Sequence, residues 1–102
     1  MASLTVIYWR DIPAQVVAEE GRGRKRSQAK VELPRRFALA IDEAAMRGGA
    51  ESTDDYLADW RKADPVACGD DLTAEAEAKA AALDLEYDKV KLAALVASGG
   101  SA

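Results

Sequence analysis

The residues best suited to bind a charged ligand are the cations of the run GRGRKR at residues 21–26. Arginine and lysine side chains hold phosphate groups, and glycines let the backbone approach an anion closely. The run lacks the strand, helix and glycine spacing of a P-loop or a dinucleotide-binding fingerprint. Three interpretations stay open: a solvated loop between strands, a patch that docks on an acidic protein surface, and a support for a phosphorylated cofactor held mainly by a partner.

A second group with binding chemistry is Trp9-Arg10-Asp11. An arginine beside a tryptophan can stack on the ring or offer a bidentate fork to a carboxylate. The alternative is that Trp9 anchors the core while Arg10 and Asp11 form a turn. The strand that ends at Trp9 is apolar on both faces, which is also typical of a surface that a partner covers.

Catalysis that depends on histidine is excluded, because the chain contains none. Cys68 therefore lacks a histidine base and is predicted to be an inert thiol. One cysteine without histidine also disfavours a zinc, haem or iron–sulfur site built by this chain alone. The carboxylates of the second half show no calcium-loop spacing and are predicted to be helix caps and a solvated face. They include Asp54, Asp55, Asp59, Asp70 and Asp71.

Length and charge place these groups in one small domain. The chain has 102 residues and a net charge of −4, and that charge repels nucleic acid. Cations gather at residues 22–36, and acids dominate residues 42–88. The single cysteine is typical of a reducing cytoplasm. No signal-peptide pattern and no apolar run near the ~20 residues of a membrane span is present, so we expect a cytoplasmic protein that does not bind membranes.

Three strands are predicted to position the binding groups. Residues 4–9 are rich in β-branched and aromatic side chains, and the turn at residues 11–13 separates them from a partner strand at residues 14–19. Residues 28–33 alternate, with Ala29, Val31 and Leu33 facing inward. The sequence therefore predicts an antiparallel three-stranded sheet, supported by helices.

Three helices are predicted to follow, over about residues 34–47, 53–62 and 71–97. The last is long and alanine-rich, and its two apolar stripes span a wider arc than a small sheet needs. It therefore either packs on the sheet and the first helix or offers a surface to a partner. Residues 1–98 form one α+β domain in this interpretation, and residues 99–102 form a frayed tail.

Residues 30–53 resemble a ribbon-helix-helix DNA-binding unit. The resemblance rests on Lys-Val-Glu-Leu-Pro at residues 30–34, the apolar Phe37 and Ile41, the glycine pair at residues 48–49 and the Ser-Thr pair before a second helix. In that family a strand pairs with its twin across a dimer, and its outward residues read bases. Those residues would be Gln28, Lys30 and Glu32 here. Glu32, the acidic second half and the upstream hairpin count against this alternative.

A broader resemblance is to a family of small bacterial proteins and domains described as virulence factor. It rests on VIYWRDIPAQVV at residues 6–17, GRGRKRSQAKVELPRRF at 21–37, AIDEAAMRGG at 40–49 and TDDYLADW at 53–60, and it extends into residues 83–95. The family name is a phenotype label inherited from multidomain members with helical repeats, and it supplies no catalytic residues. The resemblance implies an accessory subunit and a link to folate- and corrinoid-dependent one-carbon metabolism.

These observations predict a non-enzymatic accessory or protein-interaction module of a bacterial cytoplasmic complex, working without a cofactor or a metal. The expected partner is another protein or subunit, and a homo-oligomer and a DNA-binding dimer are the alternatives. The residues expected to meet a partner or an anion are Trp9, Arg10, Arg22, Arg24, Lys25, Arg26 and Arg35.

Overall fold

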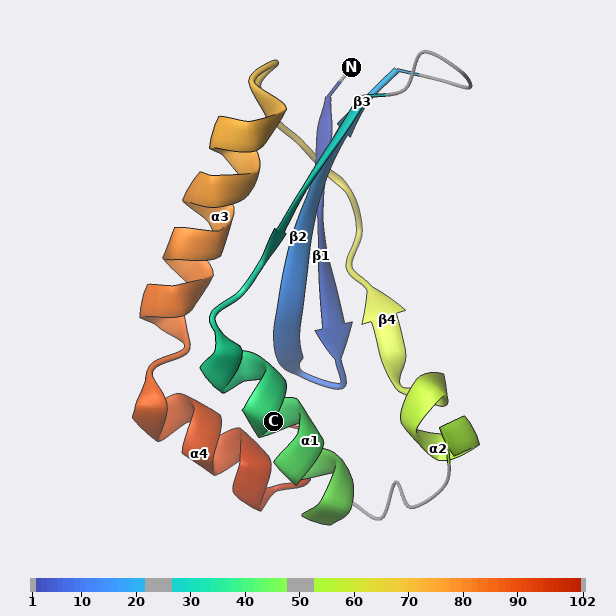
Figure 1. The fold of residues 1–102 in the computed structure, drawn as a ribbon, viewed down its shortest axis with the longest axis vertical. Coiled ribbons are helices and arrows are strands. Elements are labelled where there is room, and N and C mark those ends of the chain that lie inside the picture. The colour runs from blue at the N-terminus through green and yellow to red at the C-terminus, as the bar shows by residue number, and fades with distance from the viewer. Residues whose placement is uncertain (1, 22–26, 48–52, 102) are drawn as a thin grey trace.

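The fold is α+β, as predicted, in a computed structural model that describes residues 2–21, 27–47 and 53–101 (Figure 1). A sheet that begins at the N-terminus is followed by helices that pack beside it and below it in this view. The strands are β1 (Ser3–Trp9), β2 (Ile12–Glu20), β3 (Ser27–Glu32), β4 (Trp60–Lys62) and β5 (Val66–Ala67). The helices are α1 (Arg35–Arg47), α2 (Thr53–Ala58), α3 (Leu72–Glu86) and α4 (Lys89–Ala97).

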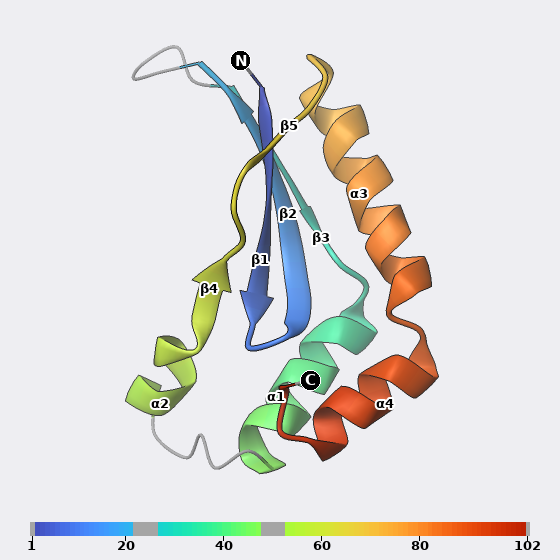
Figure 2. The same ribbon diagram turned by 180° about the vertical axis from the view of Figure 1, so that it is seen from behind.

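The sheet is antiparallel, and its strand order is β3-β2-β1-β4, with β5 also paired to β1. Figure 2 shows β4 on one side of β1 and the strands β2 and β3 on the other. The predicted strands β1, β2 and β3 are confirmed. The helix predicted over residues 53–62 is shorter in the structure, because residues 60–62 pair with β1 as a short edge strand. Residues 66–67 also pair with β1.

A bulge lies in the β1–β2 ladder between Ile7 and Tyr8, where the register shifts so that Tyr8 faces Pro13. Proline has no backbone N–H to donate, so a bulge near the end of a strand is a place where the ladder tolerates it. The bulge also bends the end of the hairpin that carries Trp9. The conformation of this turn therefore follows from Pro13 and not only from the apolar alternation.

The two faces of the sheet have different neighbours. On one face Val6, Val16 and Ala18 join the core with the α3 residues Ala76 and Ala80, because α3 packs against β2 and β3. The other face carries a shallow hollow lined only by strand residues. Its lining is mostly polar and consists of Thr5, Ile7, Gln15, Val17, Glu19, Gln28, Lys30 and Lys62.

The predicted single long helix is wrong, because it breaks at Tyr87–Asp88 into α3 and α4. The Asp88 carboxylate accepts a hydrogen bond from the Lys91 N–H at 2.9 Å and caps α4. The Arg36 guanidinium donates to the carbonyls of Asp84 and Tyr87, at 2.7 and 2.6 Å, where α3 ends. A cation at a helix C-terminus satisfies free carbonyls and the helix dipole. The break lets α4 turn back and pack against α1.

Gly99 and Gly100, predicted to belong to a frayed tail, are docked on the domain. Gly99 and Gly100 are buried and have φ values of 76° and 97°, which glycine adopts without strain. The Gly100 N–H donates to the Leu95 carbonyl at 2.7 Å, and the Gly100 carbonyl accepts from the Asp11 N–H at 2.8 Å. These glycines close α4 and hold its end against the β1–β2 turn.

Candidate functional site

Trp9 lies at the end of β1 and is fully buried, with 0% of its surface exposed. Its indole Nε1 donates to the Tyr56 carbonyl at 2.8 Å, and the two rings stack with centroids 5.7 Å apart. Buried aromatic rings contribute both apolar area and specific ring contacts. Trp9 therefore packs in the core, as the alternative interpretation predicts. Its ring offers no surface to a partner.

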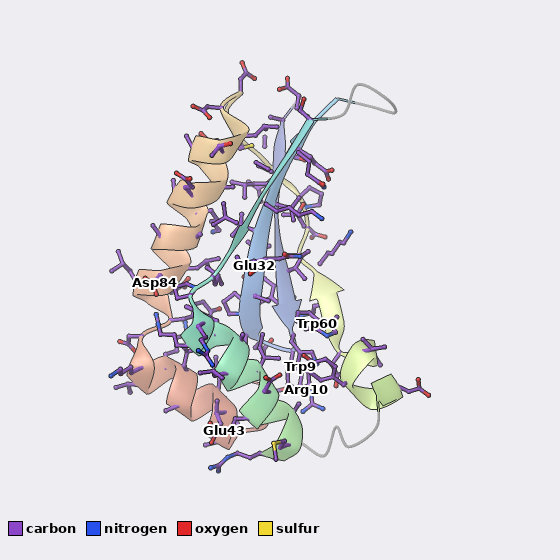
Figure 3. The ribbon with its side chains drawn as sticks, in the orientation of Figure 1. Trp9, Arg10, Glu32, Glu43, Trp60 and Asp84 are labelled. Carbon is purple, nitrogen blue, oxygen red and sulfur yellow. The ribbon has the colours of Figure 1, made fainter. Side chains whose placement is uncertain are left out.

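Arg10 follows Trp9 at the end of β1 (Figure 3), and its side chain contacts three other parts of the chain. Its guanidinium lies 4.7 Å from the centroid of the Trp9 ring, donates from Nε to the Asp59 carboxylate at 3.0 Å, and donates from Nη1 to the Gly99 carbonyl at 2.6 Å. Its backbone has a φ of 53°, which is uncommon outside glycine. Arg10 therefore joins the β1–β2 turn to the residue after α2 and to the end of the chain.

Of the other cations predicted to meet a partner, Arg35 is the one that the described residues include. Arg35 is exposed at the start of α1. The cations Arg22, Arg24, Lys25 and Arg26 lie outside the described residues. The residues on either side of that run, Gly21 and Ser27, lie at the opposite end of β2 from Ile12.

The outward residues of β3 bear on the ribbon-helix-helix alternative. Gln28, Lys30 and Glu32 are exposed. However, β3 pairs with β2 along its whole length, so one of its edges is already occupied within the chain. This pairing weighs against a ribbon made from two copies of β3, and no further observation favours DNA binding.

A groove lies between two helices and is here called the α1–α4 groove. Its volume is about 230 Å³, and its lining is largely apolar. It is lined by Arg36, Leu39, Ala40, Glu43, Lys89, Leu92, Ala93 and Val96. Leu39, which lines the groove, is 54% exposed. Two further apolar side chains of these helices are exposed outside its lining, Met46 of α1 at 81% and Val90 of α4 at 79%.

The family model described as Virulence factor matches residues 7–96. The chain belongs to the Virulence factor family. The match runs from β1 into α4, so it includes both the Trp9–Arg10 turn and the α1–α4 groove. No curated protein and no solved structure matches the chain significantly. The family assignment confirms the resemblance stated from the sequence, and it names no reaction.

Sequence reasoning about this Virulence factor family member missed Asp59, Gly99 and Gly100 as partners of the Trp9–Arg10 turn. Asp59 was expected on a solvated face, and the glycines in a frayed tail. Their contacts join residues 49 and 89 positions apart in the sequence, and no local pattern encodes such pairings. The predicted capping role of Asp71 is confirmed, since its side chain accepts from the Ala74 N–H at 3.2 Å.

Two further classes of site were sought in the described parts of this Virulence factor family member. Among residues 2–21, 27–47 and 53–101, no cluster of three or more potential metal ligands occurs. In the same ranges, no helix combines the length and the apolar character needed to cross a membrane.

Cys68 of this Virulence factor family member is partly exposed, and its thiol is expected to react slowly. Burial raises the pKa of the Cys68 thiol above its ordinary value, and the carboxylates of Glu75, Asp70 and Glu20 raise it further. Nearby negative charge disfavours the thiolate, which is the nucleophilic form. We expect the rate of its reaction with Ellman's reagent to reach half of its maximum at a higher pH than for N-acetylcysteine amide.

The substitution Glu75→Gln tests the cause of this raised pKa. It removes one of the neighbouring charges and should move the half-maximal pH of the Cys68 reaction downward. A wild-type profile at or below that of the reference thiol would contradict the assigned surroundings of Cys68.

Proposed function

We propose that this Virulence factor family member is a non-catalytic accessory subunit that receives an apolar helix of a partner protein in the α1–α4 groove. The observation that carries the proposal is the exposure of Leu39 and Met46 beside an apolar groove. Large apolar side chains on adjacent helices are expected at binding surfaces, whereas single exposed ones are ordinary.

The lining of the groove favours a helix as the occupant. Leu39 and Met46 are seven residues apart on α1, so they lie on one side of that helix. Two of the lining residues, Ala40 of α1 and Ala93 of α4, have small side chains. Packed helices place the ridges of one into the grooves of the other, and small side chains at the contact allow close approach. Recognition of a helix in a groove uses this geometry.

The charges at the edge of the groove favour a partner with both signs of charge. Arg36 and Lys89 contribute cations, and Glu43 contributes a carboxylate. An amphipathic helix with charged residues flanking its apolar face matches this arrangement, and a lipid surface does not need the carboxylate. The proposal places the complex in the cytoplasm, and the resemblance names folate- and corrinoid-dependent one-carbon metabolism as the process in which to search first.

The substitutions Leu39→Asp and Met46→Asp, made together, test the groove. We expect proteins that co-purify specifically with the tagged chain from its native cell to fall at least about tenfold, because burying each such side chain contributes about 1.5–3 kcal/mol and 1.4 kcal/mol corresponds to tenfold in affinity. Quantitative mass spectrometry of the captured proteins measures the effect.

Leu85→Asp is the matched control, since Leu85 is 83% exposed and lies on α3, whereas Leu39 and Met46 lie on one side of α1. It should leave the captured proteins unchanged, and all variants should melt close to the wild type. Capture that survives the double substitution contradicts the proposal. A wild-type dimer that the double substitution converts to a monomer, measured by light scattering, would instead assign the groove to a second copy of the chain.

A further inference from the structure

A second hollow, here called the acid–aromatic hollow, lies between the sheet, α1 and the segment from α2 into β4. Its volume is about 290 Å³. The residues that give it chemical character are Gln15, Glu32, Ile41, Asp42, Tyr56 and Trp60. They come from β2, β3, α1, α2 and β4. Figure 3 shows Glu32 on β3 and Trp60 on β4, with β2 and β1 between those two strands.

Two aromatic rings form a corner of this hollow. The ring centroids of Tyr56 and Trp60 are 5.9 Å apart, and the ring planes meet at 82°. Both residues are only partly buried, so the rings remain accessible from the hollow. The face of an aromatic ring carries negative potential and attracts cations, and tryptophan does so most strongly.

Two carboxylates complete the hollow, from Glu32 at the end of β3 and Asp42 on α1. Both residues are exposed, and no cation of the described residues lies within ion-pair distance of either. Burial raises the pKa of Tyr56, and the charge of Asp42 raises it further, so the field of that carboxylate reaches the phenol. The hollow therefore combines π faces with negative charge that no cation of residues 2–21, 27–47 or 53–101 pairs with.

Elsewhere among the described residues, an aromatic ring and a carboxylate together bind a cation. Four cations there each lie over a ring and also pair with a carboxylate. The four sets are Arg10 with Trp9 and Asp59, Arg36 with Phe37 and Asp84, Arg61 with Tyr8 and Asp11, and Lys91 with Tyr87 and Glu86. The acid–aromatic hollow has the same two components, aromatic rings and carboxylates, but no cation of the described residues occupies it.

We propose that the acid–aromatic hollow binds an organic cation, a guanidinium or alkylammonium group, between the Trp60 and Tyr56 rings and the carboxylates of Glu32 and Asp42. A hard metal ion fits less well, because it needs a shell of oxygen ligands and gains little from ring faces. The site is independent of the α1–α4 groove, since Leu39 and Met46 do not line it.

Titration with N-acetylarginine methylamide tests the site by nuclear magnetic resonance. The chain has two tryptophans, so two indole N–H signals report separately. We expect saturable shifts of the Trp60 indole and of the Tyr56 amide in the millimolar range, about −4 kcal/mol, with a smaller shift at buried Trp9. The neutral isostere N-acetylcitrulline methylamide should shift none of them saturably.

The paired substitutions Glu32→Gln and Asp42→Asn should weaken the binding at least about tenfold, because they remove both charges and retain similar shapes. Glu77→Gln is the control, because Glu77 is exposed on α3 and lines neither this hollow nor the α1–α4 groove, and it should bind as the wild type does. Equal binding of the citrulline compound, full affinity in the double variant, or no saturable shift up to about 50 mM would each overturn the proposal.

A comparison of free arginine with the blocked compound identifies the source of the cation. Free arginine binding more tightly than the blocked compound assigns the hollow to a small molecule that carries its own α-ammonium and carboxylate. Equal or tighter binding of the blocked compound assigns it to an arginine side chain of a polypeptide. Groove variants should leave this binding unchanged, so the two proposals fail separately.

Discussion

Replacing Trp9 with alanine is expected to cost about 3–5 kcal/mol of the free energy of unfolding. The ring is fully buried, it stacks on Tyr56, and its Nε1 satisfies the Tyr56 carbonyl. The guanidinium of Arg10 also loses the ring it lies over. A domain of this size has about 5–15 kcal/mol in total, so the variant should be partly unfolded at 37 °C. Urea denaturation followed by far-ultraviolet circular dichroism measures the change.

Two companion variants make the Trp9 prediction specific. Trp9→Phe keeps a ring and removes the Nε1 donor, so it should cost about 1–3 kcal/mol for the lost hydrogen bond to the half-buried Tyr56 carbonyl and for a smaller ring. Leu85→Ala, at a position that is 83% exposed, should stay within about 0.5 kcal/mol. A loss below about 1 kcal/mol in Trp9→Ala would mean that the ring is not the anchor of this end of the sheet.

Replacing Gly100 with alanine is expected to cost about 2–4 kcal/mol, the second largest effect. Its φ of 97° is strained for any residue with a side chain. A Cβ would lie 2.8 Å from Cζ3 of Trp9, and this ring is buried and cannot move aside. The substitution should therefore lift the end of the chain from the β1–β2 turn. Thermal melting and the near-ultraviolet signal of Trp9 report both effects.

Gly69→Ala is the matched control for Gly100→Ala. A Cβ at Gly69 would lie 2.9 Å from Oε1 of Glu75, which is the end of a flexible side chain that can rotate away. The φ of Gly69 is outside the left-handed region, so we expect a change within about 0.5 kcal/mol. Equal effects at the two positions would show that the docked glycines do not constrain Trp9.

The parts of the fold that the sequence predicts are those with a strong local pattern. Two-residue alternation identifies β3, the β-branched run identifies β1, and Pro34 with the spacing of Phe37 and Ile41 identifies α1. Short β4 and β5 were missed, because three and two residues are too few for a period and their strand character depends on pairing with β1. The break at Asp88 was missed because an aspartate within an alanine-rich pattern does not by itself indicate a helix end. In the structure Asp88 caps α4, and Arg36, distant in the sequence, binds the Tyr87 carbonyl just before it.

The sequence likewise predicted only part of the candidate sites. Trp9 and Arg10 stand out in the sequence, but burial assigns Trp9 to the core, and Asp59 and Gly99 bind the Arg10 side chain. The acid–aromatic hollow was not predicted, because its rings and carboxylates come from elements that meet only after folding. The exposed apolar surface of α1 was also missed, whereas excess apolar area near α4 was anticipated from its two stripes.

The position of β1 inside the sheet sets an order for folding during synthesis. The hairpin of β1 and β2 is complete early in the chain, but the outer edge of β1 is closed only by residues 60–62 and 66–67. An unpaired strand edge is a template for pairing with another chain, and pairings distant in sequence form slowly. We expect the nascent protein to be most prone to aggregation between the emergence of β2 and that of β5. The strand β4, Trp60–Lys62, covers the Ile7–Trp9 part of that edge when it docks, and β5 then covers Ser3 and Leu4.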